Sequence, residues 1–353
     1  MSTNLTQTIP APARSLPVVI FGAGSIVRDA HLPAYARAGF QVAGIYDPDH
    51  AKAAALAAAN GTRAFASVVE ATALGTGALY DLATPPAAHP AILRDLPEGA
   101  VTILQKPMGS DLAEADQIIR IIRQRQLQAA VNFQLRFAPA VLALKDAIAR
   151  GVLGEVVDFD AWLALDTPWH LWAFLADLPR VEILLHSIHY LDLVRDLFGN
   201  PQGVHAKTMG HPSSSVSNTR SAMILDYGDR LRCALSINHN HSFGRKFQAC
   251  EFRICGTKGA AWLKLGVNLD YPKGEPDELW LNTGGAWAQV PLQGNWFPEA
   301  FIGRLTQTMR FAVGEDAALQ GSAEDAWHTM ALVEAAYESS HAPAHPIRKA
   351  PDA

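Results

Sequence analysis

The segment from Val18 to Val27, VVIFGAGSIV, constrains the fold of this chain more than any other. A short β-branched strand runs into a glycine turn, and the chain then becomes helical. This arrangement points backbone N–H groups and the positive helix end at the space where a pyrophosphate lies. Gly22 makes the tight turn, and Gly24 lets the phosphates approach because it has no side chain. Val27 stands where a third glycine would pack helix against strand, so we expect a slightly displaced helix and a retained dinucleotide site.

Asp47 completes this fingerprint. It follows the apolar run 41–46 and lies 23 residues after Gly24. A carboxylate at this place accepts hydrogen bonds from the ribose hydroxyls and repels a 2′-phosphate, so the sequence predicts NAD as the cofactor in preference to NADP. The candidate cofactor-binding residues of this unit are Gly22, Gly24, Ser25, Ile26 and Asp47.

The composition excludes several classes of protein. A net charge of −5, dispersed over 353 residues, offers no basic stripe for a nucleic-acid backbone. The three cysteines form no C-x-x-C pair and no even set, which fits a reducing compartment. No apolar run is long enough to cross a bilayer, and residues 1–15 resemble a disordered tail more than a signal peptide. We therefore expect a cytoplasmic protein with neither nucleic acid nor membrane as a partner.

The pattern of apolar residues predicts two domains. From residue 16 to 135 strands and helices alternate, as in a parallel α/β sheet covered on both faces, here a Rossmann dinucleotide-binding domain. Residues 136–340 predict an α+β domain with a large, mostly antiparallel open sheet, and residues 341–353 a tail. Polar and apolar residues alternate after residue 203, so one sheet face is expected in solvent or against another subunit of a homodimer or homotetramer. Strands are predicted at 17–21, 41–46, 78–83, 101–105, 128–133, 155–165, 203–209, 219–227, 230–240, 247–255 and 259–267, and helices at 25–38, 50–60, 67–74, 89–96, 111–126, 139–150, 180–198, 298–313 and 323–339.

Lys106 follows the buried strand predicted at 101–105, and Pro107 stops further pairing. The carboxyl ends of parallel strands face the ligand crevice. The ammonium of Lys106 could therefore hold a substrate hydroxyl and stabilise the alkoxide that develops as hydride leaves, or share a proton at a lowered pKa. A solvated lysine at a strand end is the structural alternative.

The helix predicted at 180–198 carries three titratable residues on one face. At about 100° per residue, Glu182, His186 and His189 fall within roughly 60° of one another. A histidine is a natural base for the proton of a secondary alcohol whose carbinol hydrogen leaves as hydride. One of the two histidines could instead be a hydrogen-bonded core residue. A zinc site is a further alternative, with His239 and His241 nearby, but we expect no metal because nicotinamide already accepts the electrons.

Three further residues are candidates for binding substrate. Trp169 and His170 lie in an apparent loop, where an aromatic ring suits the apolar face of a sugar, although a packing loop explains them nearly as well. Arg136 could pair with a substrate carboxylate or hold the domain junction, and the junction is favoured.

Several motifs occur together in the order and spacing of one known family. They are Gly22-Ala23-Gly24 with Ala30-His31-Leu32-Pro33-Ala34, Ala83-Thr84-Pro85-Pro86 with His89, Gln105-Lys106-Pro107, Asn132-Phe133-Gln134-Leu135-Arg136-Phe137, and His189 with Asp192. From about residue 16 to 340 the chain resembles the glucose-fructose oxidoreductase and inositol dehydrogenase family (Gfo/Idh/MocA). The resemblance implies reversible NAD(P)-dependent oxidation of a hydroxyl on a sugar, inositol or related polyol. It also implies that Thr84, Pro85, His89 and Lys106 lie at the cofactor, and that Lys106 and His189 are the lysine and histidine of catalysis.

The chain departs from the family pattern at two positions. Gln105 replaces the usual glutamate beside Lys106, and Leu185 stands where an acidic residue usually precedes the histidine by one turn. Glu182 and His186 lie on the same helix face as His189, so we expect them to replace the missing acid in a rearranged proton relay.

These observations predict an NAD-dependent dehydrogenase that oxidises a monosaccharide at a ring or anomeric hydroxyl, with a cyclitol or other polyol as the second choice of substrate. The alternative from another class is a non-catalytic NAD-bound sensor on the same fold, for which the missing acid at Leu185 is the best argument. An open pocket at Lys106 and His189 would favour the enzyme, and a filled one the sensor.

Overall fold

The computed structural model describes residues 4–270 and 274–348. Its first domain is built on a five-stranded parallel sheet with the order β2-β1-β3-β4-β5. The central strands are fully buried because helices cover both faces, which explains why their residues are mainly apolar. The strands are β1 (Val18–Phe21), β2 (Val42–Tyr46), β3 (Leu79–Leu82), β4 (Val101–Leu104) and β5 (Gln128–Val131).

The helices of this domain agree with the predicted ones to within a few residues. The helix after the glycine turn opens in a π-helical turn, Val27–His31, before it continues as α1 (Leu32–Ala38). Asp111 caps α5 and Ser67 caps α3 through their side-chain oxygens. The remaining helices are α2 (His50–Ala59), α3 (Val68–Thr72), α4 (His89–Asp95) and α5 (Leu112–Gln124).

The second domain is built on an eight-stranded sheet with the order β13-β12-β11-β10-β6-β9-β8-β7. All neighbours are antiparallel except β6 and β9. The predicted fold class is therefore confirmed, although the sequence analysis missed β12 and β13. The strands are β6 (Val156–Ala164), β7 (Gly203–Met209), β8 (Arg220–Asp226), β9 (Arg232–Asn238), β10 (Ala249–Gly256), β11 (Ala260–Lys264), β12 (Glu278–Asn282) and β13 (Ala288–Val290).

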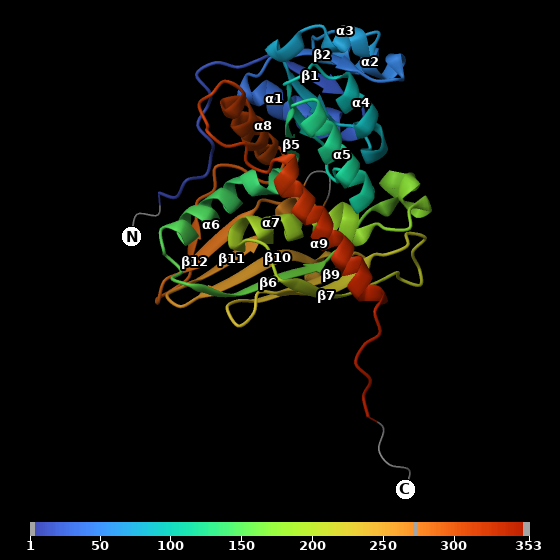
Figure 1. Cartoon of the computed structure of the whole chain (residues 1–353). Coiled ribbons are helices and arrows are strands. Elements are labelled where there is room, and N and C mark those ends of the chain that lie inside the picture. The colour runs from blue at the N-terminus through green and yellow to red at the C-terminus, as the bar shows by residue number, and fades with distance from the viewer. Residues whose placement is uncertain (1–3, 271–273, 349–353) are drawn as a thin grey trace.

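Helices lie between the eight-stranded sheet and the first domain (Figure 1). They are α6 (Pro139–Ala149), α7 (Ile188–Phe198) and the long α9 (Ala323–His341), which reaches from β5 to β7. The helix α8 (Glu299–Ala312) belongs to the first domain by packing, because its Phe301 and Leu305 share a buried cluster with Ile20 of β1. The predicted division at residue 135 therefore omits a helix that returns to cover the Rossmann sheet.

The amino-terminal tail corrects one expectation. Residues 4–15 form no helix or strand, but Leu5 is buried, the Thr6 N–H donates to Asp146, and the Gln7 amide donates to the carbonyl of Pro291. Residues 5–7 are thus packed against the second domain, so the expectation of a disordered tail is wrong there; residues 1–3 lie outside the described residues. At the other end, residues 342–348 extend from α9 without regular structure. Among the described helices, none combines the length and the apolar character needed to cross a membrane.

The outer face of the eight-stranded sheet alternates as predicted. In β8, Met223 and Leu225 are buried, whereas Ile224 between them is 55% exposed. Charged and aromatic side chains share this face, including Arg232, which pairs with Asp158 of β6.

We expect this outer face to be buried between subunits, since an exposed face that carries large apolar side chains is typical of an interface. Light scattering at micromolar concentration should give a dimer or tetramer, and Ile224→Lys should shift the population toward the 38.0 kDa chain. Val69→Lys, at an exposed position of α3, serves as the control. A monomeric wild-type protein would contradict this expectation.

Candidate active site

The glycine turn lies where the carboxyl ends of β1 and β3 meet. Gly22 has a φ of 108°, and a Cβ atom there would lie 2.4 Å from the carbonyl oxygen of Ala83, so only glycine fits. A Cβ atom on Gly24 would meet nothing within 4 Å, and both Gly24 and Ser25 are exposed, with Ile26 half-buried beside them. The turn therefore leaves exposed backbone before a helix start, which fits a bound pyrophosphate.

Asp47 is held against this turn. One carboxylate oxygen accepts a hydrogen bond from the Ala23 N–H at 2.8 Å, and the other accepts one from the Asp49 N–H at 2.9 Å. Each oxygen keeps a second lone pair, so the half-buried carboxylate can still accept ribose hydroxyls. The geometry fits the adenosine ribose of NAD.

The loop after β3 lies on the other side of the glycine turn. Thr84 contacts the turn through its methyl group, 3.4 Å from the Cβ position of Gly22, and Pro85 is exposed beside it. His89 lies deeper: it is fully buried, its Nδ1 is 3.0 Å from the carbonyl oxygen of Met108, and burial lowers its pKa. Thr84 and Pro85 are thus placed to touch a cofactor directly, whereas His89 supports the loop from below.

Lys106 joins the two domains. It follows β4, and its Nζ donates to the carbonyl of Leu185 at 2.6 Å, in the π-helical turn Glu182–Ser187 that leads into α7. Burial lowers the pKa of Lys106 to about 8. Leu185 thus contributes a backbone oxygen at the position where the sequence analysis noted a missing acidic side chain.

A buried polar network that the sequence analysis left without a role lies beside Lys106. Asp81 of β3 accepts from the Tyr35 hydroxyl at 2.7 Å and lies 2.6 Å from Nδ1 of His31. The other ring nitrogen of His31 is 3.4 Å from the Gln105 amide nitrogen. The signal that could have revealed this network is a carboxylate inside the buried strand LYDL.

His189 lies in the first turn of α7 and is only 6% exposed. Its ring is flanked edge-on by Phe133 and Trp296, and its Nδ1 has no hydrogen-bond partner among the described residues. Burial and then the positive charge of Lys106 hold its pKa well below the usual value. Both effects favour the neutral form of the His189 imidazole.

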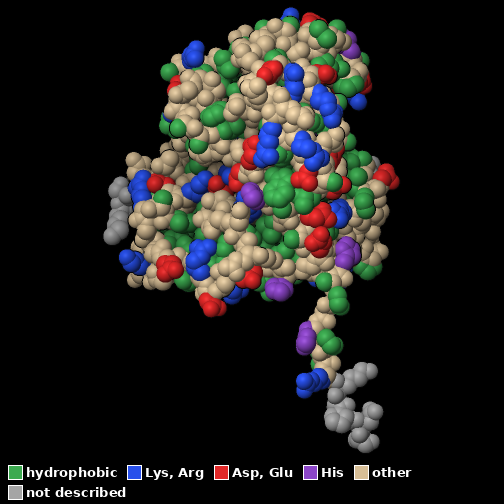
Figure 2. Space-filling model, in the orientation of Figure 1, with side chains coloured by type: hydrophobic (Ala, Val, Ile, Leu, Met, Phe, Trp, Pro, Cys, Tyr) green, Lys and Arg blue, Asp and Glu red, His purple; other side chains and the backbone are tan. Residues whose placement is uncertain are grey.

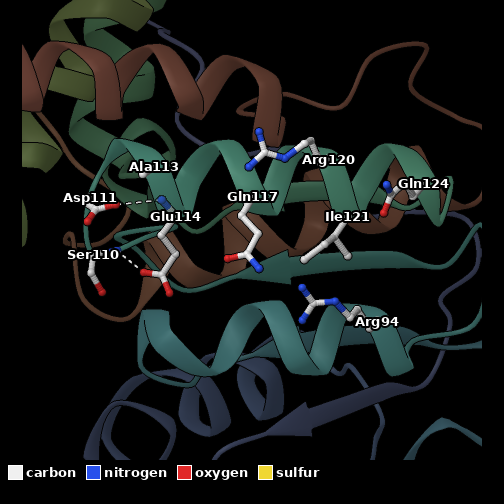
Figure 3. Close-up of a pocket in the computed structure, with 9 residues that line it drawn as sticks. All are labelled: Arg94, Ser110, Asp111, Ala113, Glu114, Gln117, Arg120, Ile121 and Gln124. Atoms are coloured by element: carbon white, nitrogen blue, oxygen red, sulfur yellow. Dashed lines mark hydrogen bonds between the residues drawn. The ribbon is translucent and has the colours of Figure 1, made fainter.

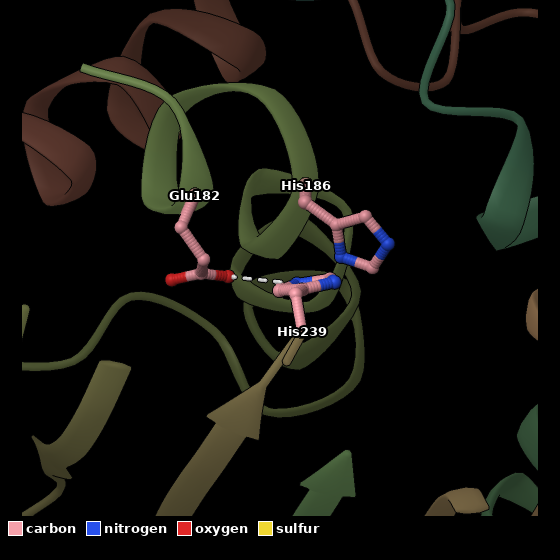
Figure 4. Close-up of side chains that lie close together, drawn as sticks. All are labelled: Glu182, His186 and His239. Carbon is pink, nitrogen blue, oxygen red and sulfur yellow. Dashed lines mark ion pairs between the residues drawn. The ribbon is translucent and has the colours of Figure 1, made fainter. Parts of the chain in front are cut away.

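Glu182 and His186 lie in the π-helical turn and point to a different neighbour (Figure 4). The carboxylate of Glu182 accepts hydrogen bonds from Ser187 and Ser221, and one of its oxygens lies 3.6 Å from Nε2 of His239. The His186 ring packs edge-on against the His239 ring, with centroids 4.2 Å apart. Burial, followed by His239, His189 and Lys106, lowers the pKa of His186 well below its usual value. Glu182 is thus linked to His239, a residue that the sequence analysis placed only near an alternative metal site.

Arg136 holds the domain junction. Its guanidinium donates to both oxygens of Asp192 and to Asp196, and it pairs with Asp325 of α9 at 2.7 Å. Burial opposes the charge, but the three carboxylates together raise the pKa of Arg136. All of these contacts are internal to the protein, so the geometry supports the junction and not the substrate-binding role.

The loop with two predicted substrate contacts forms a kinked 3₁₀ segment, Trp169–Asp177. His170 is exposed on it. Trp169 is half-buried with its ring 5.2 Å from the His239 ring, and its Nε1 is buried without a partner among the described residues. Trp169 therefore lies beside the Glu182 and His239 cluster, and His170 lies at the surface.

A surface hollow of about 710 Å³ lies elsewhere, between α4 and α5 (Figure 3). Arg94, Glu114 and Arg120 line it, and none of its lining residues belongs to the glycine turn or to α7. We assign no role in the reaction to this hollow.

On the face of the molecule shown in Figure 2, basic and acidic side chains are interspersed.

Two family models match the chain. The model of the oxidoreductase family, NAD-binding Rossmann fold, covers residues 16–133, and that of the GFO/IDH/MocA C-terminal domain covers residues 141–262. Together they account for more than half of the chain.

The chain is similar to several proteins of known sequence or structure. D-apiose dehydrogenase of Rhizobium rhizogenes is 24% identical over 269 residues, covering 74% of this chain and 76% of the relative. 1,5-Anhydro-D-fructose reductase of Ensifer adhaerens is 24% identical over 279 residues, covering 77% and 82%. An oxidoreductase from Agrobacterium radiobacter, solved in complex with NAD+, L-tartaric acid and magnesium, has a TM-score of 0.78 at 21% identity and covers 93% of this chain and 96% of that one.

Proposed function

Because the chain belongs to the GFO/IDH/MocA oxidoreductase family, we propose that it transfers hydride from a hydroxyl-bearing carbon of a monosaccharide to NAD. The observation that carries this proposal is the hydrogen bond from Lys106, which follows β4, to the carbonyl of Leu185, one helical turn before His189 of α7. The lysine is bonded to the turn before α7, and its charge acts on His189. A neutral imidazole can serve as the base for the hydroxyl proton, and an ammonium can stabilise the developing alkoxide during oxidation of an alcohol.

The cofactor would be held by the first domain. The backbone at Gly22 and Gly24 would bind the pyrophosphate, and Asp47 would accept hydrogen bonds from the ribose hydroxyls. Thr84 and Pro85 would contact the cofactor from the loop after β3. When bound, NAD supplies the hydride acceptor.

The protein's own residues handle the proton. His189 is neutral at physiological pH because its pKa is depressed, so its ring nitrogen can accept the hydroxyl proton. Lys106, with a pKa of about 8, is mostly protonated at neutral pH and can donate to the same oxygen, which stabilises the developing negative charge. The expected relay through Glu182 is not part of this proposal, because Glu182 faces Ser187, Ser221 and His239.

The substrate class rests on the relatives and on the loop at Trp169. The relatives named D-apiose dehydrogenase and 1,5-anhydro-D-fructose reductase act, by name, on sugars. The partly exposed indole of Trp169, beside the Glu182 and His239 cluster, suits the apolar face of a sugar ring. A monosaccharide is therefore the first choice, and a cyclitol the second, since an inositol 2-dehydrogenase of Leifsonia xyli is 34% identical over 149 residues.

The proposal is tested by NADH formation from NAD with a panel of aldoses, ketoses, deoxysugars and inositols. We expect turnover on at least one aldose or related sugar, and weaker or no turnover on the inositols. Turnover on no member of the panel, with NAD binding intact, would favour the sensor.

That sensor remains the second candidate for one reason. His189 is only 6% exposed between Phe133 and Trp296, which leaves little of its ring accessible to a substrate in this conformation. A sensor would not need a substrate to reach this ring.

Cofactor choice gives a separate prediction. Wild-type enzyme should prefer NAD, and Asp47→Ser should reduce the ratio of kcat/KM for NAD to that for NADP by roughly tenfold or more, or ~1.4 kcal/mol, because the charge facing a 2′-phosphate is removed. Asp49→Ser is the matched control, since Asp49 caps α2 through the Lys52 N–H and serine can do the same. Equal use of both cofactors by the wild type would contradict the role of Asp47.

A further inference from the structure

The cluster of Glu182, His186 and His239 has the composition and the arrangement of a metal site. One donor atom from each residue lies within 4.8 Å of the other two (Figure 4). Glu182 and His239 are completely buried and His186 is half-buried. We infer that these three residues bind a divalent transition-metal cation such as Zn²⁺.

The donor atoms are available for such an ion. Nδ1 of His186 and Nε2 of His239 are buried and have no hydrogen-bond partner among the described residues, although buried polar atoms are normally paired. The distance between Nε2 of His239 and the Glu182 oxygen, 3.6 Å, is too long for a normal hydrogen bond. It is close to the ~3.3 Å that separates two ligands at about 2.0–2.1 Å from a tetrahedral zinc.

The surrounding residues orient the ligands. Thr167 Oγ1 lies 2.7 Å from Nδ1 of His239, which leaves Nε2 of that ring aimed at Glu182. Ser187 and Ser221 donate to Glu182 and fix its carboxylate. Metal-binding histidines and carboxylates characteristically have such partners in their second coordination sphere.

The donor set selects the kind of ion. Two imidazoles and one carboxylate suit zinc and its neighbours, whereas Mg²⁺ and Ca²⁺ prefer oxygen ligands. Three protein ligands leave a fourth position for water or another oxygen donor. The site uses His239 in place of His189, so it leaves the proposed base free, and it does not depend on the proposed sugar oxidation.

The test uses the full-length protein without a polyhistidine tag, treated with a chelator. Titration with Zn²⁺, and separately with Co²⁺ followed by visible absorption, should show one equivalent bound per chain, with a Co²⁺ spectrum of low-symmetry nitrogen and oxygen coordination. Mg²⁺ at the same concentrations should not bind. The wild-type titration alone decides the point: absence of stoichiometric Zn²⁺ and Co²⁺ binding would overturn the inference.

Variants assign the ligands. His239→Gln and Glu182→Gln should each weaken Zn²⁺ binding by at least about 10²-fold, because loss of an outer partner alone typically costs 10–100-fold. His205→Gln, which removes an exposed histidine of β7, should bind as the wild type does. If either buried variant fails to fold by circular dichroism, His186→Gln replaces it, since His186 is less buried than Glu182 and His239. Wild-type affinity in a folded variant of any of the three would contradict the assignment.

Discussion

Replacing His189 with alanine is expected to lower kcat by roughly 10²-fold or more on the best sugar of the panel, the usual loss when a positioned base is removed. NAD binding should stay near that of the wild type, because His189 lies on α7 and the glycine turn lies in the other domain. The measurements are steady-state kinetics and direct titration with NAD.

A control variant shows the effect of losing a histidine away from the site. His328 is exposed on α9, its ring contacts Trp327, and among the described residues it makes no hydrogen bond or ring contact with Lys106 or α7, so His328→Ala should leave turnover unchanged. Thermal unfolding of both variants shows whether the loss of the buried ring destabilises the fold. Wild-type turnover in His189→Ala across the pH range would show that another residue is the base, and His170 would be tested next.

Lys106 is expected to set the upper pH limit of the reaction. Its pKa of about 8 means that the ammonium is present below that pH and lost above it, so kcat/KM should fall as pH rises through about 8. The pKa of His189 lies well below the usual value, so titration of His189 should cause no second change of kcat/KM near neutral pH. Lys106→Ala should lower kcat by roughly 10²-fold or more and abolish the upper limb.

The direction in which kcat/KM changes with pH distinguishes two roles of Lys106, the ammonium as hydrogen-bond donor and the neutral amine as base. Lys106→Arg keeps a positive charge at every accessible pH. The decline of kcat/KM should therefore shift to higher pH, even if the rate itself falls. A wild-type kcat/KM that rises through pH 8 would contradict the assignment, because the neutral amine would then be the base.

The first domain could be predicted almost completely from the sequence. Its central strands are buried on both faces, so they are short and mainly apolar runs bounded by turns, as in β1 and β4, with Asp81 of β3 as an exception. The strand β13 was missed because it has only three residues, two of them exposed, whereas β12 was missed although it is as long as β2. The tail at Leu5 was misjudged because polar and proline-rich segments can still pack when their backbone finds partners elsewhere.

The candidate site was predictable in its residues but not in its pairings. Helical geometry placed Glu182, His186 and His189 on one face, yet a π-helical turn at Glu182–Ser187 changes the rotation per residue. Glu182 consequently faces His239, which comes from the end of β9 more than 50 residues later in the chain. No local pattern reveals such a partner, because it is set by how the sheet packs against α7.

The central claim is that a carbon-bound hydrogen of a sugar leaves as hydride toward NAD while Lys106 and His189 manage the proton. It is tested most directly by a reaction of the wild-type enzyme with NAD and sugars deuterated at every carbon, followed by mass spectrometry of the NADH. The account predicts deuterium in the NADH formed from a monosaccharide, and a strongly reduced amount of deuterated NADH with Lys106→Ala and with His189→Ala at equal protein and time. NADH without deuterium, or no NADH from any sugar while NAD still binds, would contradict it.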